Sequence, residues 1–363
     1  MSPGDPTGDR RIVGADRSAA AAGEAHEQRS PAALILIWSR HGWLLLALAL
    51  VALALLPRFT SPYQLRTYTQ TLLLMVMAQG WNLVGGFMGY TAFGNVAFFG
   101  IGAYTTGLLM LSRWQVSFFP ALLAGACVAA LFAAVVGLPV LRLKGHYFAI
   151  ATLGIAEAAR QVADTWDGLT SGSTGIDLPM QANDAFFYWT ALGLSALGLL
   201  LTWMLARSKI GYGWVAIRED EEAAVMLGID ATRFKVLAFA LSAIFAALAG
   251  GVTAYQNVHV TPTDFFKIDY TLQMIIAAII GGTGTVFGPC LGAALYQMAG
   301  TYLWGSFREL HPTFLGLILV FFIIFLPRGV AQILRTAAEA ATGRRRLTWR
   351  GFFSDLDATR LTE

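Results

Sequence analysis

The stretch that decides the fold is "ATRFKVLAFALSAIFAALAGG" at 231–251, in which a long apolar run follows a short charged start. Its length is close to the ~20 residues that a helix needs to cross a bilayer, and similar runs recur along the chain. The chain is 56% hydrophobic and 13% charged, whereas soluble domains typically carry ~25% charged residues. Because the runs are continuously apolar and do not alternate, they favour helices over a β-barrel. The sequence therefore predicts an all-α, polytopic transmembrane helix bundle.

About ten membrane-crossing or broken helices are predicted from the apolar runs and from the prolines and glycines that separate them. The first run starts too far from the N-terminus to be the apolar core of a cleaved signal peptide, so it is interpreted as a membrane helix. The predicted helices cover 42–57, 68–86, 95–112, 118–140, 146–162, 185–205, 235–256, 268–282, 289–304 and 313–327.

The distribution of Lys and Arg between the loops predicts the orientation. Basic residues occur in both tails and in the 141–145 and 206–234 connections, whereas the 163–184 loop has Asp residues but neither Lys nor Arg. Ten helices with both termini in the cytoplasm place every basic segment inside and the acidic loop outside. The predicted organisation is a disordered cytoplasmic tail over 1–31, a transmembrane domain over 32–330 and a basic cytoplasmic tail over 331–363.

Two glycine-rich segments interrupt the pattern of plain helices: "GGFMGYTAFGN" at 85–95 and "GGTGTVFGP" at 281–289. They are either tight turns between helices or a pair of broken helices, because non-helical backbone at membrane depth occurs only where it is buried in protein or lines a cavity. Gly-interrupted segments at corresponding places in two halves point to a transport pathway. The two segments also suggest a weak internal repeat of 68–165 and 235–330.

Motifs for catalysis and cofactor binding are absent from the sequence. It has no G-x-x-x-x-G-K-[ST] phosphate loop, no H-E-x-x-H and no cysteine pairs with metal-ligand spacing. We therefore expect no enzyme activity and no cofactor or metal in this chain. Cys127 and Cys290 lie in apolar runs and are expected to be buried as small hydrophobic residues. Glu157 and Arg160 are three residues apart and are either a structural pair or part of a proton relay.

A charged segment, "WVAIREDEEAAVMLGI" at 214–229, separates two of the most hydrophobic stretches. Asp220 is expected to cap the start of a short helix there, and Gly228 to end it. Asp230 is expected to cap the long helix that follows. The short helix would fit closely into a groove of another protein; the alternative is a solvated amphipathic loop. Its expected small apolar face comprises Ala223, Ala224 and Leu227.

The pattern E-A-A-x-x-x-G at 222–228 resembles the coupling helix of ABC importer permeases, which docks into the ATPase subunit. Five blocks, in order within 68–330, resemble the branched-chain amino acid permease family of the LivM type. Three departures are a polar N-terminal extension longer than is usual for the family, a missing I-x-L-P element after the coupling loop, and Asn95, which stands where the family usually has His. The five blocks are "GYTAFGNVAFFGIGAYTTGLL" (89–109), "LKGHYFAIATLGIAE" (143–157), "TSGSTGI" (170–176), "SKIGYGWVAIREDEEAAVMLGID" (208–230) and "IIGGTGTVFGPCLGAAL" (279–295).

The resemblance implies a permease subunit of an ATP-driven importer for branched-chain amino acids or similar small amphipathic solutes. Its implied partners are a second, homologous permease, two ATPase subunits that use the ATP, an extracytoplasmic solute-binding protein and the lipid of a bacterial inner membrane. Other members of the family take urea, short amides or aromatic acids, so the substrate stays open. The alternative is an ion-coupled secondary transporter or channel, which usually needs carboxylates or histidines at membrane depth. The residues implied for coupling are Arg218, Glu222, Ala223, Ala224 and Gly228.

A substrate path is predicted from polar groups in otherwise apolar surroundings. Gln79 and Asn82 are three apart and share a face of one helix, where an amide needs a partner. They either line the path or bond between helices. No fixed charge occurs in the set, which suits a neutral or zwitterionic solute with an apolar part. The predicted path residues are Gln79, Asn82, Gly89, Tyr90, Thr91, Asn95, Gly281, Gly282, Thr283 and Gly284.

The outer loop is predicted to contribute to docking of the binding protein or to an outer gate. Its stretch "LTSGSTGIDLP" at 169–179 is small, polar and free of positive charge. The alternative is a plain solvated connection.

Overall fold

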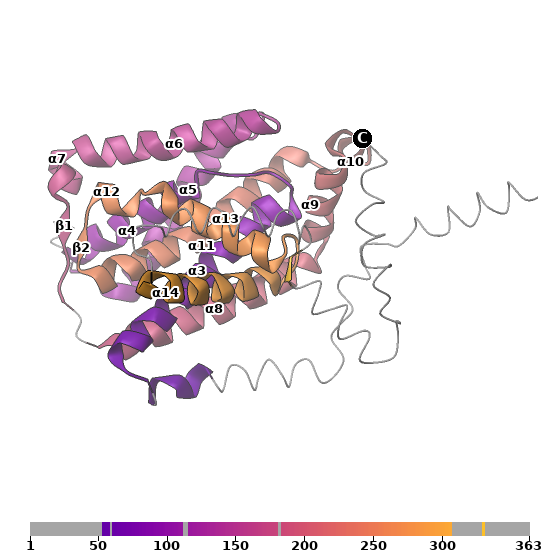
Figure 1. Ribbon diagram of the computed structural model, residues 1–363. Helices are drawn as coiled ribbons and strands as arrows, with labels where there is room; N and C mark the ends of the chain where they lie inside the picture. Colours follow the sequence, from indigo (N-terminus) through magenta and orange to yellow (C-terminus); the bar gives the residue numbers. More distant parts are fainter. Residues whose placement is uncertain (1–52, 59, 112–114, 181–182, 307–328, 331–363) are drawn as a thin grey trace, which may run out of the picture. The chain divides into compact units, whose positions relative to one another are not determined.

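A computed structural model describes residues 53–58, 60–111, 115–180, 183–306 and 329–330 (Figure 1). The chain divides into two units, Met1–Leu53 and Ala54–Glu363, and the elements below belong to the second. The described part consists of helices apart from a two-stranded ribbon. The predicted all-α helix bundle is therefore confirmed.

The elements follow one another along the described chain without a large sheet (Figure 1). They are η2 (Leu56–Arg58), α3 (Pro62–Asn82), the π-helix η3 (Leu83–Phe87), α4 (Asn95–Leu111), α5 (Phe118–Val140), α6 (His146–Thr165), α7 (Asp167–Thr170), η4 (Gly172–Thr174), β1 (Ile176–Asp177), α8 (Asp184–Ala206), α9 (Lys209–Glu219), α10 (Glu221–Met226), α11 (Ala231–Asn257), β2 (His259–Val260), α12 (Pro262–Phe265), α13 (Ile268–Gly281) and α14 (Gly288–Ser306).

Eight of the predicted helical segments lie in the described residues, apart from residue 112, and all eight are helices there, although α13 ends at Gly281, one residue before its predicted end. The largest difference is at α3, which begins at Pro62 and not at 68 because Ser61 and Gln64 form a capping box with proline in the first turn. Three described helices, α5, α8 and α11, are long and apolar enough to cross a membrane, and α4 is a shorter apolar helix. The predicted helix at 313–327, most of the one at 42–57 and the tails 1–31 and 331–363 lie outside the described residues.

Small residues bring the central helices into close contact. α11 packs along α4, α5 and α3, and a Cβ on Gly102 of α4 would collide with the backbone of Ala247 in α11. The same holds between α13 and α14, where a Cβ on Gly281 would collide with the carbonyl of Gly288. Close approach of backbones through Gly and Ala is the usual way in which membrane helices gain packing contacts.

The register between α4 and α11 is offset. Asn95, the first residue of α4, donates from Nδ2 to Oγ of Ser242 at 2.8 Å. Ser242 lies eleven residues after Ala231, the first residue of α11, which is about 16 Å along a helix axis. The non-helical residues 88–94 therefore lie beside the first part of α11, and α4 accompanies only the remainder.

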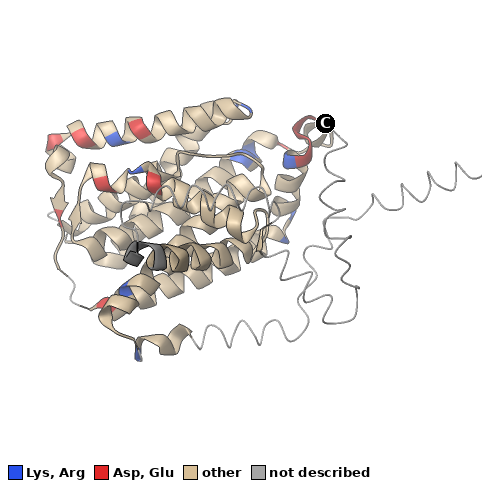
Figure 2. Ribbon diagram, viewed as in Figure 1, with Lys and Arg blue, Asp and Glu red and all other residues tan. Residues whose placement is uncertain are grey.

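The end of the bundle opposite α10 carries a short ribbon and many acidic side chains (Figures 1 and 2). β1 pairs antiparallel with β2, with Ile176 opposite Val260, so the predicted outer loop is tied to the connection after α11. In α6, Arg160 Nε donates to both carboxylate oxygens of Glu157 at 3.0 Å. This contact within one helix favours the structural pair over a proton relay.

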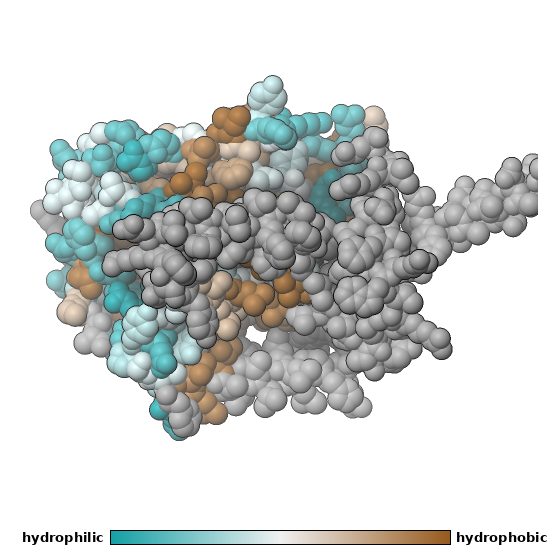
Figure 3. Space-filling view, viewed as in Figure 1, coloured by the Kyte–Doolittle hydropathy of each residue, from teal (hydrophilic) through white to brown (hydrophobic). Residues whose placement is uncertain are grey.

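On the face seen in Figure 3, apolar residues gather about midway along the helices. Apolar side chains also lie exposed along α5, among them Leu123, Leu131 and Val135. In a membrane protein such a face meets lipid or another subunit. Cys127 is exposed in this helix, so the expectation of a buried Cys127 was wrong: an apolar run in a membrane helix need not face the core. Cys290 is half-buried.

Candidate functional site

α10 is a short helix with defined ends. Asp220 caps its start, since Oδ1 accepts from the backbone N–H of Glu222 at 2.9 Å and of Ala223 at 3.0 Å. At its end the N–H of Gly228 donates to Val225 O and the N–H of Ile229 to Ala224 O. These two bonds form a Schellman motif, which requires positive φ at its glycine, and Gly228 has φ of +86°. The predicted cap and stop are confirmed.

The exposed face of α10 differs from the predicted one. Ala224 is only 2% exposed and packs inside this chain, whereas Met226 is 89% and Leu227 82% exposed. The expectation that Ala224 faces another protein was therefore wrong, because its side of the helix lies against the bundle. Glu222, Ala223 and Gly228 are exposed as a coupling surface requires. Val225, Met226 and Leu227 form the α10 apolar surface.

Arg218, at the end of α9, reaches both glycine-rich segments. Its Nη1 donates to the carbonyl of Gly86 at 2.9 Å, and its Nη2 to Oε1 of Glu219 at 2.9 Å. A Cβ on Gly89 would lie 2.5 Å from Cγ of Arg218, and one on Gly284 would lie 3.2 Å from Nη1. Gly89 also has φ of +79°, so glycine is required there for both space and backbone conformation. The predicted coupling and path residues therefore meet at this arginine.

Asn82, at the end of α3 just before the first glycine-rich segment, bonds to the second segment. Its Oδ1 accepts from the N–H of Gly284 at 2.8 Å, and its Nδ2 donates to the carbonyl of Thr285 at 2.9 Å. The amide is fully buried, and both of its ends are used by the protein. For Asn82 the geometry favours bonding between helices over a place in the substrate path.

The two glycine-rich segments have different structures. The first is a broken helix, because α3 passes into the π-helix η3 and then into non-helical residues 88–94. The second is a tight turn between α13 and α14, in which Thr285 Oγ1 accepts from the N–H of Gly288 at 3.0 Å. Gly281 and Gly282 are buried there, and Thr283 is exposed. The first segment is therefore a broken helix, and the second is a tight turn between helices.

Gln79 and Asn95 are the predicted path residues whose buried polar atoms are incompletely bonded. Gln79 Nε2 donates to Sγ of Cys290 at 2.7 Å, and Asn95 Nδ2 donates to Ser242. Both side chains are fully buried. Within the described part of the chain, Oε1 of Gln79 and Oδ1 of Asn95 have no hydrogen-bond partner. A buried acceptor without a donor is costly, so these two oxygens are the candidate contacts for a passing solute.

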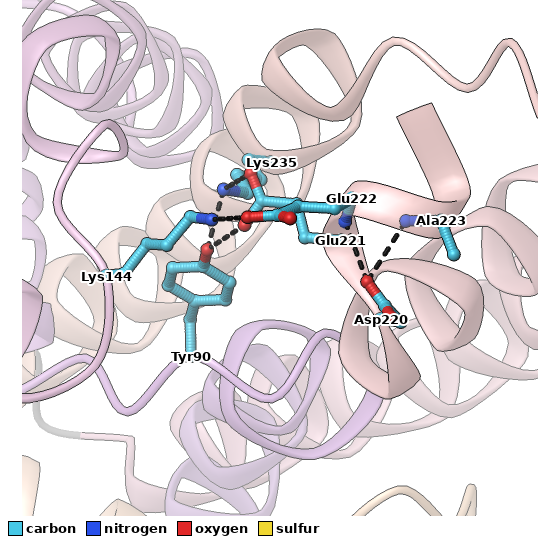
Figure 4. Close-up of polar contacts among 7 residues, drawn as sticks. All are labelled: Tyr90, Lys144, Asp220, Glu221, Glu222, Ala223 and Lys235. Carbon is cyan, nitrogen blue, oxygen red and sulfur yellow. Dashed lines mark hydrogen bonds and ion pairs between the residues drawn. The ribbon is translucent and has the colours of Figure 1, made fainter. Parts of the chain in front are cut away.

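Tyr90 belongs to the surroundings of α10 (Figure 4). Its Oη donates to Oε2 of Glu221 at 2.6 Å and accepts from Nζ of Lys235 at 2.6 Å. Lys235 Nζ also donates to Oε1 of Glu221 at 2.6 Å. This placement favours a coupling role for Tyr90 over a place in the substrate path, and its neighbour Thr91 is exposed.

Glu221 stays ionised in this cluster. Burial opposes its ionisation, but hydrogen bonds from Lys235 and Tyr90, with the positive charges of Lys235 and Lys144, hold its pKa below its ordinary value. Neither Glu221 nor Lys235 was among the predicted site residues. A lysine in an otherwise apolar helix was the signal that could have pointed to them, because such a charge needs a partner.

Comparison with known proteins shows the family to which this chain belongs. The model of the branched-chain amino acid transport system / permease component family matches residues 63–323. The chain belongs to this permease family. The high-affinity branched-chain amino acid transport system permease protein LivM of Salmonella typhimurium is 30% identical, over 83% of this chain and 77% of its own length. The LivM of Escherichia coli is also 30% identical, over 82% of this chain and 77% of its length.

A permease of this family can be similar over part of its length to importers of other solutes. The autoinducer 2 import system permease protein LsrC of Klebsiella pneumoniae is 32% identical over 42% of this chain and 47% of its own length. No solved structure matches this permease. The relatives are transport permeases, so this chain is a membrane transport subunit.

Proposed function

We propose that this chain is the membrane-spanning subunit of an ATP-driven importer for branched-chain amino acids or similar small amphipathic solutes. ATP is used by two separate ATPase subunits, and this chain itself holds no cofactor. A second, homologous permease completes the membrane part, and an extracytoplasmic binding protein delivers the solute. The importer resides in a bacterial inner membrane.

The α10 apolar surface is the observation that carries the proposal. Val225, Met226 and Leu227 are between 51% and 89% exposed on a helix of six residues that is capped at both ends. A cluster of exposed apolar side chains marks a contact with another protein or with the membrane, and we assign this one to the ATPase. Arg218 and Glu221 connect this surface to the broken helix, so a protein bound there can act on the membrane helices.

Charge supports the orientation that this function requires. Lys144 lies in the connection before α6, and Lys209, Arg218 and Arg233 lie in the 206–234 segment around α10, whereas the connection 166–183 between α6 and α8 has neither Lys nor Arg. Because Lys and Arg are enriched in cytoplasmic connections, this distribution supports a cytoplasmic α10, on the side where the ATPases act. With ten membrane helices, the proposed orientation corresponds to both termini in the cytoplasm and to the outer loop on the side of the binding protein.

The candidate path favours a small solute without a multiple charge. Gln79 and Asn95 each present an uncharged acceptor oxygen, which can bind an ammonium group or an N–H. No side-chain carboxylate or histidine bonds to either amide in the described part of the chain. A multiply charged solute would lose its hydration there without a counter-ion, whereas an amino acid with an apolar side chain fits.

The test is the substitution Met226→Asp in the complex expressed with its ATPases. A buried, unpaired charge in an interface costs several kcal/mol, so we expect loss of ATPase co-purification and of solute-stimulated ATP hydrolysis. Met180→Asp is the matched control for co-purification with the ATPases, because Met180 is also exposed (83%) and lies in the loop at the opposite end. Normal co-purification of the Met226→Asp variant would contradict the proposal. Uptake driven by an ion gradient in vesicles without ATPases would favour a secondary transporter instead.

A further inference from the structure

The ion pair between Lys235 and Glu221 is set apart by its burial. Their side chains are only 4% and 22% exposed. Each of the other ion pairs between described residues has at least one side chain that is more than half exposed. A buried ion pair is a poor means of gaining stability, because the desolvation of two charges offsets their attraction. Its value for this protein therefore lies in what it holds together.

The cluster joins three separate elements at one point (Figure 4). Glu221 comes from α10, Lys235 from α11 and Tyr90 from the broken segment 88–94. Each group bonds to the other two at 2.6 Å. Lys235 Nζ also lies 4.5 Å from the centroid of the Tyr90 ring, and Phe148 packs edge-on against the same ring. The phenol is thus fixed in position as well as bonded.

Other bonds attach the broken segment to the membrane helices. The indole N–H of Trp81 in α3 donates to Ala92 O at 2.9 Å, and the N–H of Phe93 donates to Oγ1 of Thr152 in α6 at 3.1 Å. Tyr90 supplies the bond to α10. Arg218 supplies a second connection nearby, to Gly86. The segment therefore lies between the coupling helix and the helices around the buried amides.

We propose that Tyr90 is a positioning residue for coupling, which passes a displacement of α10 to the broken segment 88–94 through its bond to Glu221. This inference rests on the proposed function. Lys235 holds the Glu221 carboxylate in place for the bond. Because separating these buried charges would leave each one unpaired, α10 and Tyr90 move together when the ATPases displace α10.

The first measurement is amide hydrogen exchange of residues 88–94 in the full chain, which does not depend on ATP or on a solute. Tyr90→Phe removes the hydroxyl and leaves the ring and the Lys235–Glu221 pair. Since a hydrogen bond to a charged group is lost, we expect exchange to become roughly tenfold faster in this segment. Tyr147→Phe is the control, because that tyrosine is 75% exposed, and we expect no change.

The second measurement is the number of ATP molecules hydrolysed for each solute molecule transported by the reconstituted complex. We expect this ratio to rise several-fold in Tyr90→Phe and in Glu221→Gln. The exchanged pair, Glu221→Lys with Lys235→Glu, keeps one cation and one carboxylate beside the phenol. This double variant should restore a low ratio of ATP to solute, whereas Glu221→Lys alone and Lys235→Glu alone should not. A loss of folding cannot produce this pattern.

Different outcomes overturn the two proposals. Unchanged exchange at 88–94 in Tyr90→Phe would show that the phenol does not hold the segment and would overturn this inference alone. Faster exchange with an unchanged ratio of ATP to solute would also overturn it, because the link would then carry no coupling. Absence of solute-stimulated ATP hydrolysis in the unaltered complex would overturn the proposed function and this inference with it.

Discussion

Gln79 is a buried amide whose two ends have different surroundings. Its Nε2 is bonded to Cys290, whereas its Oε1 has no partner among the described residues and lies where a Cβ on Gly198 of α8 would be 2.9 Å away. Leaving a buried acceptor unbonded costs about 1–3 kcal/mol. At the residue scale, this arrangement makes sense if a donor from a solute meets the oxygen during transport.

We expect Gln79→Leu to lower transport at least about fivefold, which corresponds to the loss of one hydrogen bond of ~1 kcal/mol to the solute. The thermal stability of this variant should stay close to that of the unaltered protein, because only one of the two polar atoms of Gln79, Nε2, forms a hydrogen bond. Uptake into proteoliposomes and thermal unfolding are the measurements. Thr202→Val is the control, since Thr202 also has a buried, unbonded oxygen in the described part. Unaltered uptake by Gln79→Leu would remove Gln79 from the path.

The charge of Glu221 predicts a dependence on pH. Its pKa in the folded chain lies below the ordinary value of 4.5, so ionised Glu221 stabilises the fold fully above pH 4.5, and this contribution is lost as the pH falls through the lower, folded value. Lys235, Lys144 and Tyr90 are the groups that interact with the carboxylate. The stability difference between the unaltered chain and Glu221→Gln should stay constant at neutral pH and shrink below pH 4.5. A constant difference down to pH 3 in thermal unfolding would contradict this.

At the scale of elements, local signals in the sequence were read correctly. The cap by Asp220, the stop at Gly228 and the cap by Asp230 each depend on residues within five positions along the chain. The exposed face of α10 was not predicted correctly, because the burial of Ala224 depends on the rest of the bundle. The Tyr90–Glu221–Lys235 cluster was missed for the same reason, since Tyr90 and Glu221 are 131 residues apart.

The two glycine-rich segments show the same limit. Both begin with Gly-Gly and contain Phe-Gly, so their composition could not separate a broken helix from a tight turn. The turn at 282–287 is completed by its own Thr285. Segment 88–94 is held instead by bonds to α3, α6 and α10. Of these three helices, only α3 is close to the segment in the sequence.

The outer loop contains the short helix η4 and the strand β1, and some of its side chains are exposed. Thr174 in η4 is exposed, and Gly175 after it packs against Val260. We expect Thr174→Trp to weaken binding of the solute-binding protein about tenfold, because bulk in an interface costs ~1–3 kcal/mol. The affinity of the reconstituted complex for the binding protein is the measurement, with Tyr212→Trp in α9 as control. Equal affinities would favour the plain solvated connection. This substitution is better than a deletion of 171–175, which would also disturb the β1–β2 pairing.

At the scale of the whole molecule, α11 connects the two ends of the transport unit. It starts directly after the α10 segment, where Asp230 caps it, and it leads at Asn257 into β2, which pairs with the outer loop. Between these ends it packs against α3, α4 and α5. A tilt of this one helix would therefore change both ends of the bundle together, which is what alternating access requires.

The close packing of α13 on α14 has a mechanical consequence. A Cβ on Gly281 or on Gly292 would collide with a facing backbone carbonyl, so the two helices touch main chain to main chain, without long side chains that could change rotamer. Shear between packed helices depends on such side-chain adjustments. We infer that this hairpin moves as a rigid body and that bending during the transport cycle is concentrated in hinges elsewhere. The non-helical backbone between η3 and α4 is the natural place for one of them.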